Sequence, residues 1–292
     1  MDKSNPYRQK PRWLKRPLSN SAEFSRVKRA LSSHGLSTVC QEAQCPNRGE
    51  CWSTGTATFI ILGDTCTRGC AFCAVKRAVS GKTPEGEARR LAAAATDLNL
   101  DYVVLTSVTR DDLPDGGASH YAEAVRSIKA LSPPPLVEVL IPDYLDGPLD
   151  TLLASSPDVL AHNIETVRRL SPSLRHPAFS HDRSLNVLKE AKRLSPETIL
   201  KSSILLGMGE ERSEVTEAMV ELFEAGVEIL VLGQYLRPGP SNHPVARYLP
   251  PEEFAELASA GEEIGFSFVA GAPFARTSYR AAEGYVKARS GG

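Results

Sequence analysis

The sequence lacks a long apolar run and any large excess of charge, and both absences restrict the possible function classes. No stretch of about 18 apolar residues occurs in the 292-residue chain, so we expect no membrane span. The N-terminus has no apolar segment before a small-residue cleavage site, which argues against a secretory signal. A formal net charge of −1 argues against a nucleic-acid-binding protein. We therefore expect a cytoplasmic globular protein whose thiols stay reduced.

Cysteine is absent from the whole chain after residue 73, which makes the six earlier cysteines informative. They form two triplets, one spaced Cys-x4-Cys-x5-Cys and one spaced Cys-x3-Cys-x2-Cys: Cys40, Cys45 and Cys51, then Cys66, Cys70 and Cys73. Disulfides are typical of small secreted domains. Structural zinc usually takes four ligands from paired Cys-x2-Cys knuckles, and inert buried cysteines would not cluster in this way. Iron–sulfur clusters are therefore the favoured interpretation.

The second triplet offers one thiolate fewer than a cubic four-iron cluster has irons. Three ligands leave one iron open, and an open iron can bind the amino and carboxylate groups of a substrate. The spacing, with Phe72 before the last cysteine, resembles that of the radical S-adenosylmethionine enzymes, in which the cofactor supplies the chemistry and the protein orients it. Gly69 would let the backbone approach the cluster closely.

Strand-like and helix-like segments alternate from residue 58 onward. The expected strands are 58–63, 102–107, 136–141, 158–163, 198–206, 228–233 and 266–270, and the expected helices are 85–97, 118–131, 149–155, 183–194, 213–225 and 252–264. This alternation favours parallel strands joined by crossover helices. The prediction is an α/β fold, a partial (β/α)6 TIM-like barrel over residues 56–270, with a basic cysteine-bearing extension over 1–55 and another extension over 271–292. A doubly wound sheet is the alternative, although neither a Gly-x-Gly-x-x-Gly nor a Walker motif is present.

Such barrels bind their ligands at the carboxyl ends of the strands. Polar residues at these ends are therefore the expected contacts of S-adenosylmethionine: Thr106, Ser107, Asn163, Glu165, Lys201, Gln234, Tyr235 and Arg237. His162 is interpreted as structural, because a lone histidine in a strand usually is.

Several longer stretches resemble the lipoyl synthases. They are ATFIILGDTCTRGCAFCAV, YVVLTSVTRDDLPDGGA, AHNIETV, KSSILLGMGE, LGQYLRP and RTSY, and with the first cysteine triplet they extend the resemblance from Arg12 to Arg280. A biotin-synthase-like enzyme is the nearest alternative, but that family would not place Cys-x4-Cys-x5-Cys upstream. A ferredoxin-like carrier would use four cysteines for each cluster, and a zinc module would leave S-adenosylmethionine untouched.

The resemblance implies two 4Fe–4S clusters and S-adenosylmethionine as cofactors. Cys66, Cys70 and Cys73 would hold the radical-generating cluster, whereas the auxiliary, sulfur-donating cluster would be held by Cys40, Cys45, Cys51 and Ser278. The family motif Arg-Ser-Ser-Tyr is changed here to Arg276-Thr277-Ser278-Tyr279, and Arg276 is expected beside the serine oxygen or nearby sulfides. Gly117 aligns with a position whose backbone meets the methionine amine in related enzymes. The implied reaction inserts sulfur at carbons 6 and 8 of a protein-bound octanoyl group.

The resemblance also implies protein partners. The octanoyl group would arrive on a lipoyl carrier domain, either of a 2-oxoacid dehydrogenase E2 or of the glycine cleavage H protein, and a reductant such as ferredoxin or flavodoxin would supply electrons. Nine basic and two acidic residues lie between Met1 and Arg29. A solvated tail is the simpler interpretation of this charge, and docking of an acidic carrier through Arg12, Lys15 and Arg16 is the alternative. We expect a monomer with neither a nucleic-acid nor a membrane partner.

Overall fold

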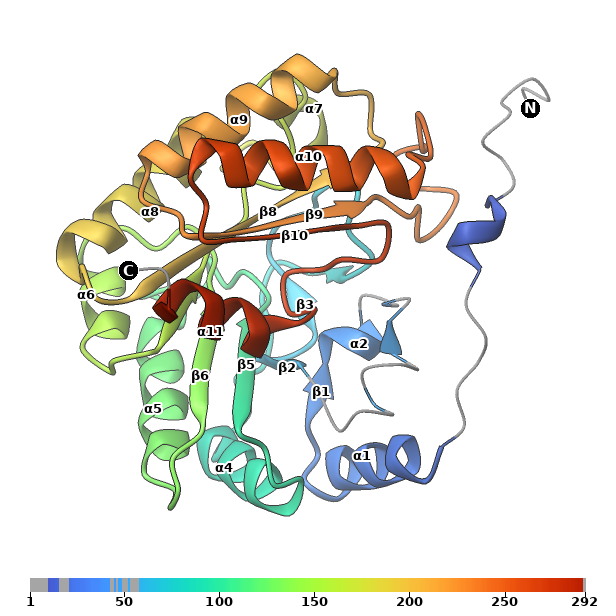
Figure 1. Ribbon diagram of the computed structural model, residues 1–292. Helices are drawn as coiled ribbons and strands as arrows, with labels where there is room; N and C mark the ends of the chain where they lie inside the picture. Colours follow the sequence, from blue (N-terminus) through green and yellow to red (C-terminus); the bar gives the residue numbers. More distant parts are fainter. Residues whose placement is uncertain are drawn as a thin grey trace.

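The computed structural model describes residues 10–15, 21–42, 45, 47, 48, 52 and 58–290. Within these residues the largest element is a curved eight-stranded sheet (Figure 1). Its strands lie side by side in chain order: β1 (Ser37–Thr38), β2 (Thr58–Ile61), β5 (Tyr102–Ser107), β6 (Leu136–Leu140), β7 (Val159–Ala161), β8 (Ile199–Leu206), β9 (Ile229–Gln234) and β10 (Phe268–Ala272). The short strand β1 pairs antiparallel with β2, and the other neighbouring strands pair in parallel.

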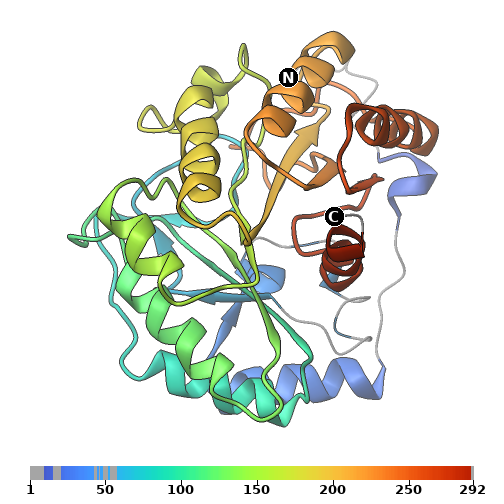
Figure 2. The same ribbon diagram turned by 60° about the vertical axis from the view of Figure 1, so that its left-hand side comes forward.

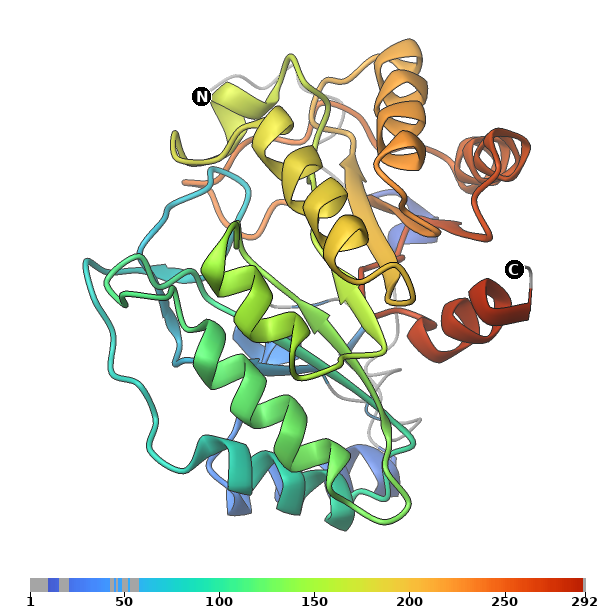
Figure 3. The same cartoon turned by 90° about the vertical axis from the view of Figure 1, so that its left-hand side faces the viewer.

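Helices follow the parallel strands and surround the outer side of the sheet (Figure 3). They are α4 (Glu87–Asp97), α5 (Ala118–Lys129), α6 (Gly147–Leu153), α8 (His181–Leu194), α9 (Arg212–Glu224) and α10 (Pro251–Ile264). The strand order never reverses, as it would in a doubly wound sheet. The partial barrel predicted from the sequence is therefore confirmed, whereas the domain boundaries after residues 55 and 270 stay predictions.

Several shorter elements have no counterpart in the sequence prediction. They are the 3-10 helix η2 (Arg12–Leu14), the helices α1 (Ala22–Ser33), α2 (Val39–Glu42), α7 (Ser171–Leu174) and α11 (Ala281–Ser290), and the paired strands β3 (Thr65–Cys66) and β4 (Lys76–Arg77). No helix among the described residues is both long and apolar enough to cross a membrane.

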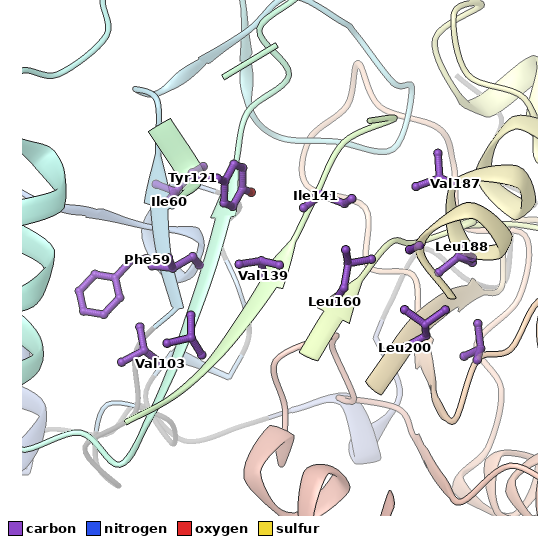
Figure 4. Packing of buried hydrophobic residues seen from close by; sticks show 14 of the residues in the cluster. Phe59, Ile60, Val103, Tyr121, Val139, Ile141, Leu160, Val187, Leu188 and Leu200 are labelled. Atoms are coloured by element: carbon purple, nitrogen blue, oxygen red, sulfur yellow. The ribbon is translucent and has the colours of Figure 1, made fainter. Parts of the chain in front are cut away.

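Successive strand residues point to opposite faces of the sheet, and both faces are used here. One set packs toward the helices and is 0% exposed: Phe59, Val103, Val139, Leu160 and Leu200 (Figure 4). Figure 4 also shows Val187 and Leu188 of α8 beside this set. Residues of opposite parity, such as Ile60 and Val104, face the barrel interior and line a cavity. One face of the sheet therefore forms the hydrophobic core with the helices, and the opposite face lines the cavity inside the barrel.

Helix α11 closes the amino-terminal end of the barrel (Figure 2). Its Ala288 packs with the first residues of three strands, Val159, Ile199 and Ile229. The ring of Tyr285 meets the edge of Tyr102 in β5, with 6.4 Å between ring centroids. Because side chains fill this end, a ligand site has to lie at the carboxyl ends of the strands, as in other barrels.

A buried ion pair joins β6 to the amino-terminal half of β8 across the barrel interior. The Lys201 ammonium lies 3.0 Å from both carboxylate oxygens of Glu138, and the two side chains are 1% and 0% exposed. The Tyr102 hydroxyl donates to the same carboxylate at 2.7 Å. Burial beside Glu138 raises the pKa of Tyr102, so the phenol stays protonated and remains a donor. The three groups satisfy one another where water is excluded.

We predict that Lys201→Met destabilises the apoprotein by about 3–5 kcal/mol, because it leaves the Glu138 carboxylate buried without a counter-charge. Urea unfolding followed by circular dichroism measures this change. The double variant Lys201→Met/Glu138→Leu removes both charges and should recover most of the loss. Equal stabilities of Lys201→Met and the wild type would show that the Glu138 carboxylate does not need Lys201 as its counter-charge.

Candidate functional site

A cavity of about 550 Å³ opens among the carboxyl ends of the strands. The four cysteines whose side chains the structure describes are free thiols, and all of them line this cavity: Cys45, Cys66, Cys70 and Cys73. The backbone of Cys40 lies in α2, whereas Cys51 lies outside the described residues. The structure thus brings one cysteine of the first triplet into the same cavity as the complete second triplet.

The loop that carries the second triplet is held from outside by distant segments. The Ala71 amide donates to the Leu174 carbonyl at 2.7 Å, and the Ala71 carbonyl accepts from the His243 amide at 2.8 Å. The side-chain amide of Asn242 donates to the Cys73 carbonyl at 2.8 Å. These bonds fix the loop between the residues before α8 and those after β9. The cysteine positions are therefore set by the barrel as well as by the loop itself.

The donor set in this loop fits an iron–sulfur cluster. The backbone amides of Arg68 and His176 donate to the sulfurs of Cys66 and Cys70, each at 3.4 Å. Such bonds stabilise cluster thiolates and tune their reduction potential. Among the described residues, no three His, Cys, Asp or Glu side chains are grouped closely enough to hold a single metal ion. Cysteines that each bind a different iron of one cluster do not need to approach so closely.

Burial opposes ionisation of the free thiols in this loop. It raises the pKa of Cys70 and raises the pKa of Cys73 to about 11. Thiolates here therefore need a compensating positive charge, which bound iron supplies as it displaces the thiol protons. Part of the compensation comes from Arg175, a buried guanidinium whose charge favours the Cys70 thiolate.

Most of the residues expected at S-adenosylmethionine line the cavity. They are Thr106, Ser107, Asn163, Glu165, Tyr235 and Arg237. Glu165 has φ of 66°, a left-handed conformation that is strained for a residue other than glycine. Its amide donates to the Ser203 carbonyl at 3.1 Å, and its carbonyl accepts from the Leu205 amide at 2.8 Å. Pairing with β8 thus holds Glu165 in this conformation at the cavity wall, where burial raises the pKa of its carboxyl group.

The structure does not bring Lys201, Gln234 or Gly117 to the cavity, and it does not support their expected contacts with S-adenosylmethionine. Lys201 lies early in β8 and pairs with Glu138. The Gln234 side-chain amide donates to the Leu206 and Arg247 carbonyls, and its oxygen accepts from the Leu249 amide. These bonds connect β9 to the end of β8 and to the segment that carries Arg247 and Leu249.

Gly117 has a structural reason to be glycine. It precedes α5 with φ of 92°, and a β-carbon there would lie 2.3 Å from Leu62 Cδ1. The helix could not approach the end of β2 so closely with a larger residue. His162, interpreted as structural, also lines the cavity; its ring lies within hydrogen-bonding distance of the Ile141 carbonyl and 3.2 Å from Asp143.

The segment Arg276-Thr277-Ser278 reaches the cavity from the end of β10. The side-chain amide of Asn163 donates to the Thr277 hydroxyl at 3.0 Å, and the Ser203 hydroxyl lies 3.2 Å from the same oxygen. Asn47 donates to the Phe274 carbonyl at 2.5 Å from the opposite side. The changed position of the motif, Thr277, therefore anchors this segment to the barrel.

Two further residues of the cavity wall were not expected from the sequence. Arg175 and Phe179 lie in RHPAFSHDRSL, a stretch for which we make no prediction from the sequence. The guanidinium carbons of Arg68 and Arg175 lie 4.1 and 4.5 Å from the centre of the Phe179 ring. Both contacts are within the range of cation–π attraction. No spacing pattern in the sequence indicates them, because they depend on the path of the chain around α7.

We predict that Thr277→Val loosens the segment that carries Ser278, since the variant keeps the side-chain volume but loses the hydroxyl. Removing the bonds to Asn163 and Ser203 should cost about 1–1.5 kcal/mol locally, equivalent to about tenfold faster amide exchange. Hydrogen–deuterium exchange of residues 275–280 in the cluster-free protein measures this. Thr277→Ser, which keeps the hydroxyl, is the matched control. Identical exchange in both variants would contradict the anchoring role.

Comparisons with known proteins agree with this geometry. Residues 60–222 match the Radical SAM superfamily model. The chain is 51% identical to the lipoyl synthase of Methanocella arvoryzae, covering 97% of this chain and 96% of that protein. It is 50% identical to the lipoyl synthase of Thermus thermophilus, covering 96% and 88%. The chloroplastic lipoyl synthase of Arabidopsis thaliana is 46% identical and covers 97% of this chain and 74% of its own length.

Solved structures support the fold independently. Methylornithine synthase superimposes with a TM-score of 0.57 at 14% identity, covering 91% of this chain and 75% of that one. Streptococcus suis SuiB bound to S-adenosylmethionine gives 0.53 at 13% identity, covering 77% and 47%. These distant likenesses establish the architecture, and the near-full-length relatives establish the family. The chain belongs to the lipoyl synthase family of the radical SAM superfamily.

Proposed function

We propose that this chain forms the lipoyl group on octanoylated carrier domains, with the cavity between the cysteine loop and Ser278 as the reaction site. Lipoyl synthase activity, with two 4Fe–4S clusters and S-adenosylmethionine, follows from the family to which the chain belongs. One observation supports the residue assignments most strongly. Cys45, the second cysteine triplet and Ser278 come from distant parts of the sequence and line the same cavity.

Cys66, Cys70 and Cys73 would hold the first cluster, and Cys40, Cys45, Cys51 and Ser278 the second. When bound, the first cluster and S-adenosylmethionine supply a radical that takes hydrogen from the octanoyl chain, and the second cluster supplies the sulfur. The chain's own contribution is to position these groups and to exclude water. Apolar side chains suited to an alkyl chain also line the cavity, among them Ile60, Val104, Leu140 and Val231.

Six strand-end residues are proposed to bind S-adenosylmethionine. They are Thr106, Ser107, Asn163, Glu165, Tyr235 and Arg237. The half-buried Glu165 carboxylate accepts a hydrogen bond from the Asn163 side-chain amide at 3.0 Å. Burial disfavours the ionised form of this carboxyl group, and a cationic ligand placed beside it would stabilise that form. S-adenosylmethionine carries a sulfonium and an ammonium group, so its charge suits this wall of the cavity.

Ser278 is proposed as the oxygen ligand of the second cluster. An alkoxide is a hard ligand on iron that otherwise binds sulfur, so it can leave as sulfide is withdrawn. Arg276 beside it is half-buried and lines the cavity, and its partial burial lowers the pKa of its guanidinium. The charges of Cys45 and Glu165 act in the opposite direction and favour the guanidinium cation. Arg276 would thus stabilise negative charge next to Ser278.

The basic N-terminal arm is proposed to dock the carrier domain. Lipoyl synthases act on lipoyl carrier domains, and the carrier here would be that of a 2-oxoacid dehydrogenase E2 or the glycine cleavage H protein. Lys10 lines the cavity, and Trp13 Nε1 donates to the Leu249 carbonyl at 3.2 Å. Arg12 and Lys15 are exposed beside Trp13, whereas Arg16 lies outside the described residues. The arm therefore supports docking next to the cavity.

Of the remaining assignments, only the electron donor rests on the family resemblance; the location rests on the sequence composition, and the monomer is the default state. The proposed reductant is a ferredoxin or flavodoxin, the proposed location is the cytoplasm, and the proposed state is a monomer. Relatives of this chain include archaeal, bacterial and chloroplastic lipoyl synthases, so the family operates in several compartments.

The function is tested by separating radical formation from sulfur insertion. The reconstituted wild-type protein should bind about eight irons, four per cluster. With dithionite, S-adenosylmethionine and an octanoyl-lysine peptide, it should form deoxyadenosine and dithiolated peptide. Ser278→Ala should still form deoxyadenosine but lose most sulfur insertion, whereas Ser290→Ala on α11 should behave as the wild type. Full sulfur insertion by Ser278→Ala would exclude the proposed ligand, and no deoxyadenosine from the wild type would exclude the function.

Docking through the arm predicts a salt effect that depends on the substrate. Raising the salt concentration should lower turnover of an octanoylated carrier domain, because screening weakens attraction between exposed charges. Turnover of the short peptide, which lacks an acidic domain surface, should change much less. Arg12→Glu/Lys15→Glu should reproduce the salt effect at low salt. Equal salt sensitivity of both substrates would contradict the docking role.

A further inference from the structure

Strand β4 covers the side of the cysteine loop that faces away from the cavity. Arg77 of β4 pairs in parallel register with Cys66 of β3, and the Ala78 amide donates to the Cys66 carbonyl at 3.0 Å. The Cys66 side chain lines the cavity, but neither residue of β4 does. Lys76 and Arg77 are both exposed to solvent. Since paired strands lie about 4.8 Å apart, one exposed strand separates the backbone of a cluster ligand from solvent.

The loop after β4 is firmly attached at its far end. Arg110, which is 1% exposed, donates to the Gly81 carbonyl at 2.6 Å and to the Leu62 carbonyl at the end of β2 at 2.8 Å. Between these attachments and β4, the side chain of Val79 is 94% exposed. Figure 3 shows the segment from β4 to α4 on the outside of the molecule. The loop therefore holds an apolar side chain in solvent on a well-supported backbone.

Three basic residues lie within three positions of this exposed valine along the chain. Lys76 has one weak partner, Asp64, at 3.9 Å on the exposed surface. Within the described part of the chain, Arg77 and Lys82 make no ion pair. The nearby carboxylates of Asp111 and Asp112 are bound by Arg68 and Arg110. We call Lys76, Arg77, Val79 and Lys82 the basic strip.

The basic strip also touches the cysteine loop directly. The Arg77 side chain lies over Gly69, next to Cys70, so that a β-carbon at Gly69 would come within 3.0 Å of Arg77 Cδ. An exposed apolar side chain flanked by cations suits a surface that binds an acidic protein, because complementary charges steer the two proteins together. Electron transfer between proteins requires their redox groups to be close. Of the reaction partners, the electron donor is the one that needs to approach the first cluster without entering the cavity.

We propose that the basic strip docks an acidic one-electron donor protein, which reduces the cluster held by Cys66, Cys70 and Cys73. The reduced flavin or iron–sulfur group of the donor loses one electron and the cluster gains it, without bond formation or proton transfer. This inference rests on the proposed function, since it needs a redox cluster in the loop. The carrier domain is a poorer fit, because its octanoyl chain has to reach the cavity and the strip lies on the other side of the loop.

The test compares a protein donor with a small reductant on the reconstituted holoenzyme. Lys76→Glu/Lys82→Glu reverses two exposed charges but leaves Arg77 and Gly69 in place. Lys189→Glu/Lys287→Glu, on α8 and α11, is the matched control for net charge. Deoxyadenosine formation is driven either by a reduced flavodoxin of net negative charge or by dithionite. The Kd for oxidised flavodoxin is measured in parallel by calorimetry at low salt.

The strip variant should lose about tenfold in flavodoxin-driven rate and in flavodoxin affinity at low salt. Its dithionite-driven rate should equal that of the wild type, and the control variant should match the wild type in every assay. Unchanged flavodoxin affinity would overturn the proposal. An equal fall with dithionite would overturn it as well, because the effect would not depend on the donor. Failure of the wild type with dithionite would instead refute the proposed function, and this inference with it.

Discussion

The structure depends on keeping three cysteines of one short loop in place without a fourth cysteine beside them. A loop that left one iron open would be free to rearrange unless something outside it fixed its shape. Here the Ala71 amide and the carbonyls of Ala71 and Cys73 bond to Leu174, Asn242 and His243, which follow β7 and β9. Hydrogen bonds from two backbone amides to the sulfurs of Cys66 and Cys70 stabilise the thiolate form of these cysteines. The barrel is thus the support that a three-ligand cluster requires.

The same constraint explains why distant ends of the chain meet over the barrel. Strand β10 pairs in parallel with β9, so the residues that follow it emerge at the same edge as the other strand ends. Ser278 reaches the cavity in this way, held by Thr277 on the barrel side and by the bond from Asn47 to Phe274 on the N-terminal side. The first cysteine segment and the last motif are therefore positioned by each other as well as by the sheet. A change in either would move the ligands of the proposed second cluster.

Much of this could be predicted because hydrophobic periodicity and cysteine spacing are local signals. The strand 102–107 agrees with β5 at both ends, and the radical-type triplet needed only its spacing. How far along a strand a residue lies, and therefore whether it reaches the cavity, is not a local signal of this kind. Lys201 faces the barrel interior as a site residue would, but it lies near the start of β8, where Glu138 neutralises it. Its position in the KSS string gave no indication of that partner.

Other details depend on contacts that no single segment encodes. Gln234 ends a strand like a ligand-binding residue, yet its side-chain amide is bonded to the end of β8 and to the segment that carries Arg247 and Leu249. The two-residue strands β3 and β4 are too short for an alternating pattern, although β3 carries Cys66 and β4 pairs with it on the exposed side. Asn163 combines both kinds of information. Its place at a strand end correctly predicts the cavity, but its bond to Thr277 becomes visible only once β10 is in position.

The central claim is that one cavity accommodates two clusters, one against the second cysteine triplet and one between Cys45 and Ser278. An anaerobic crystal structure of the reconstituted protein, with iron located by anomalous scattering, tests it most directly. We expect two separate four-iron groups at opposite walls of the cavity, with the Ser278 oxygen bound to an iron of the second. A single cluster, zinc in either triplet, or a second cluster remote from Ser278 would contradict the account.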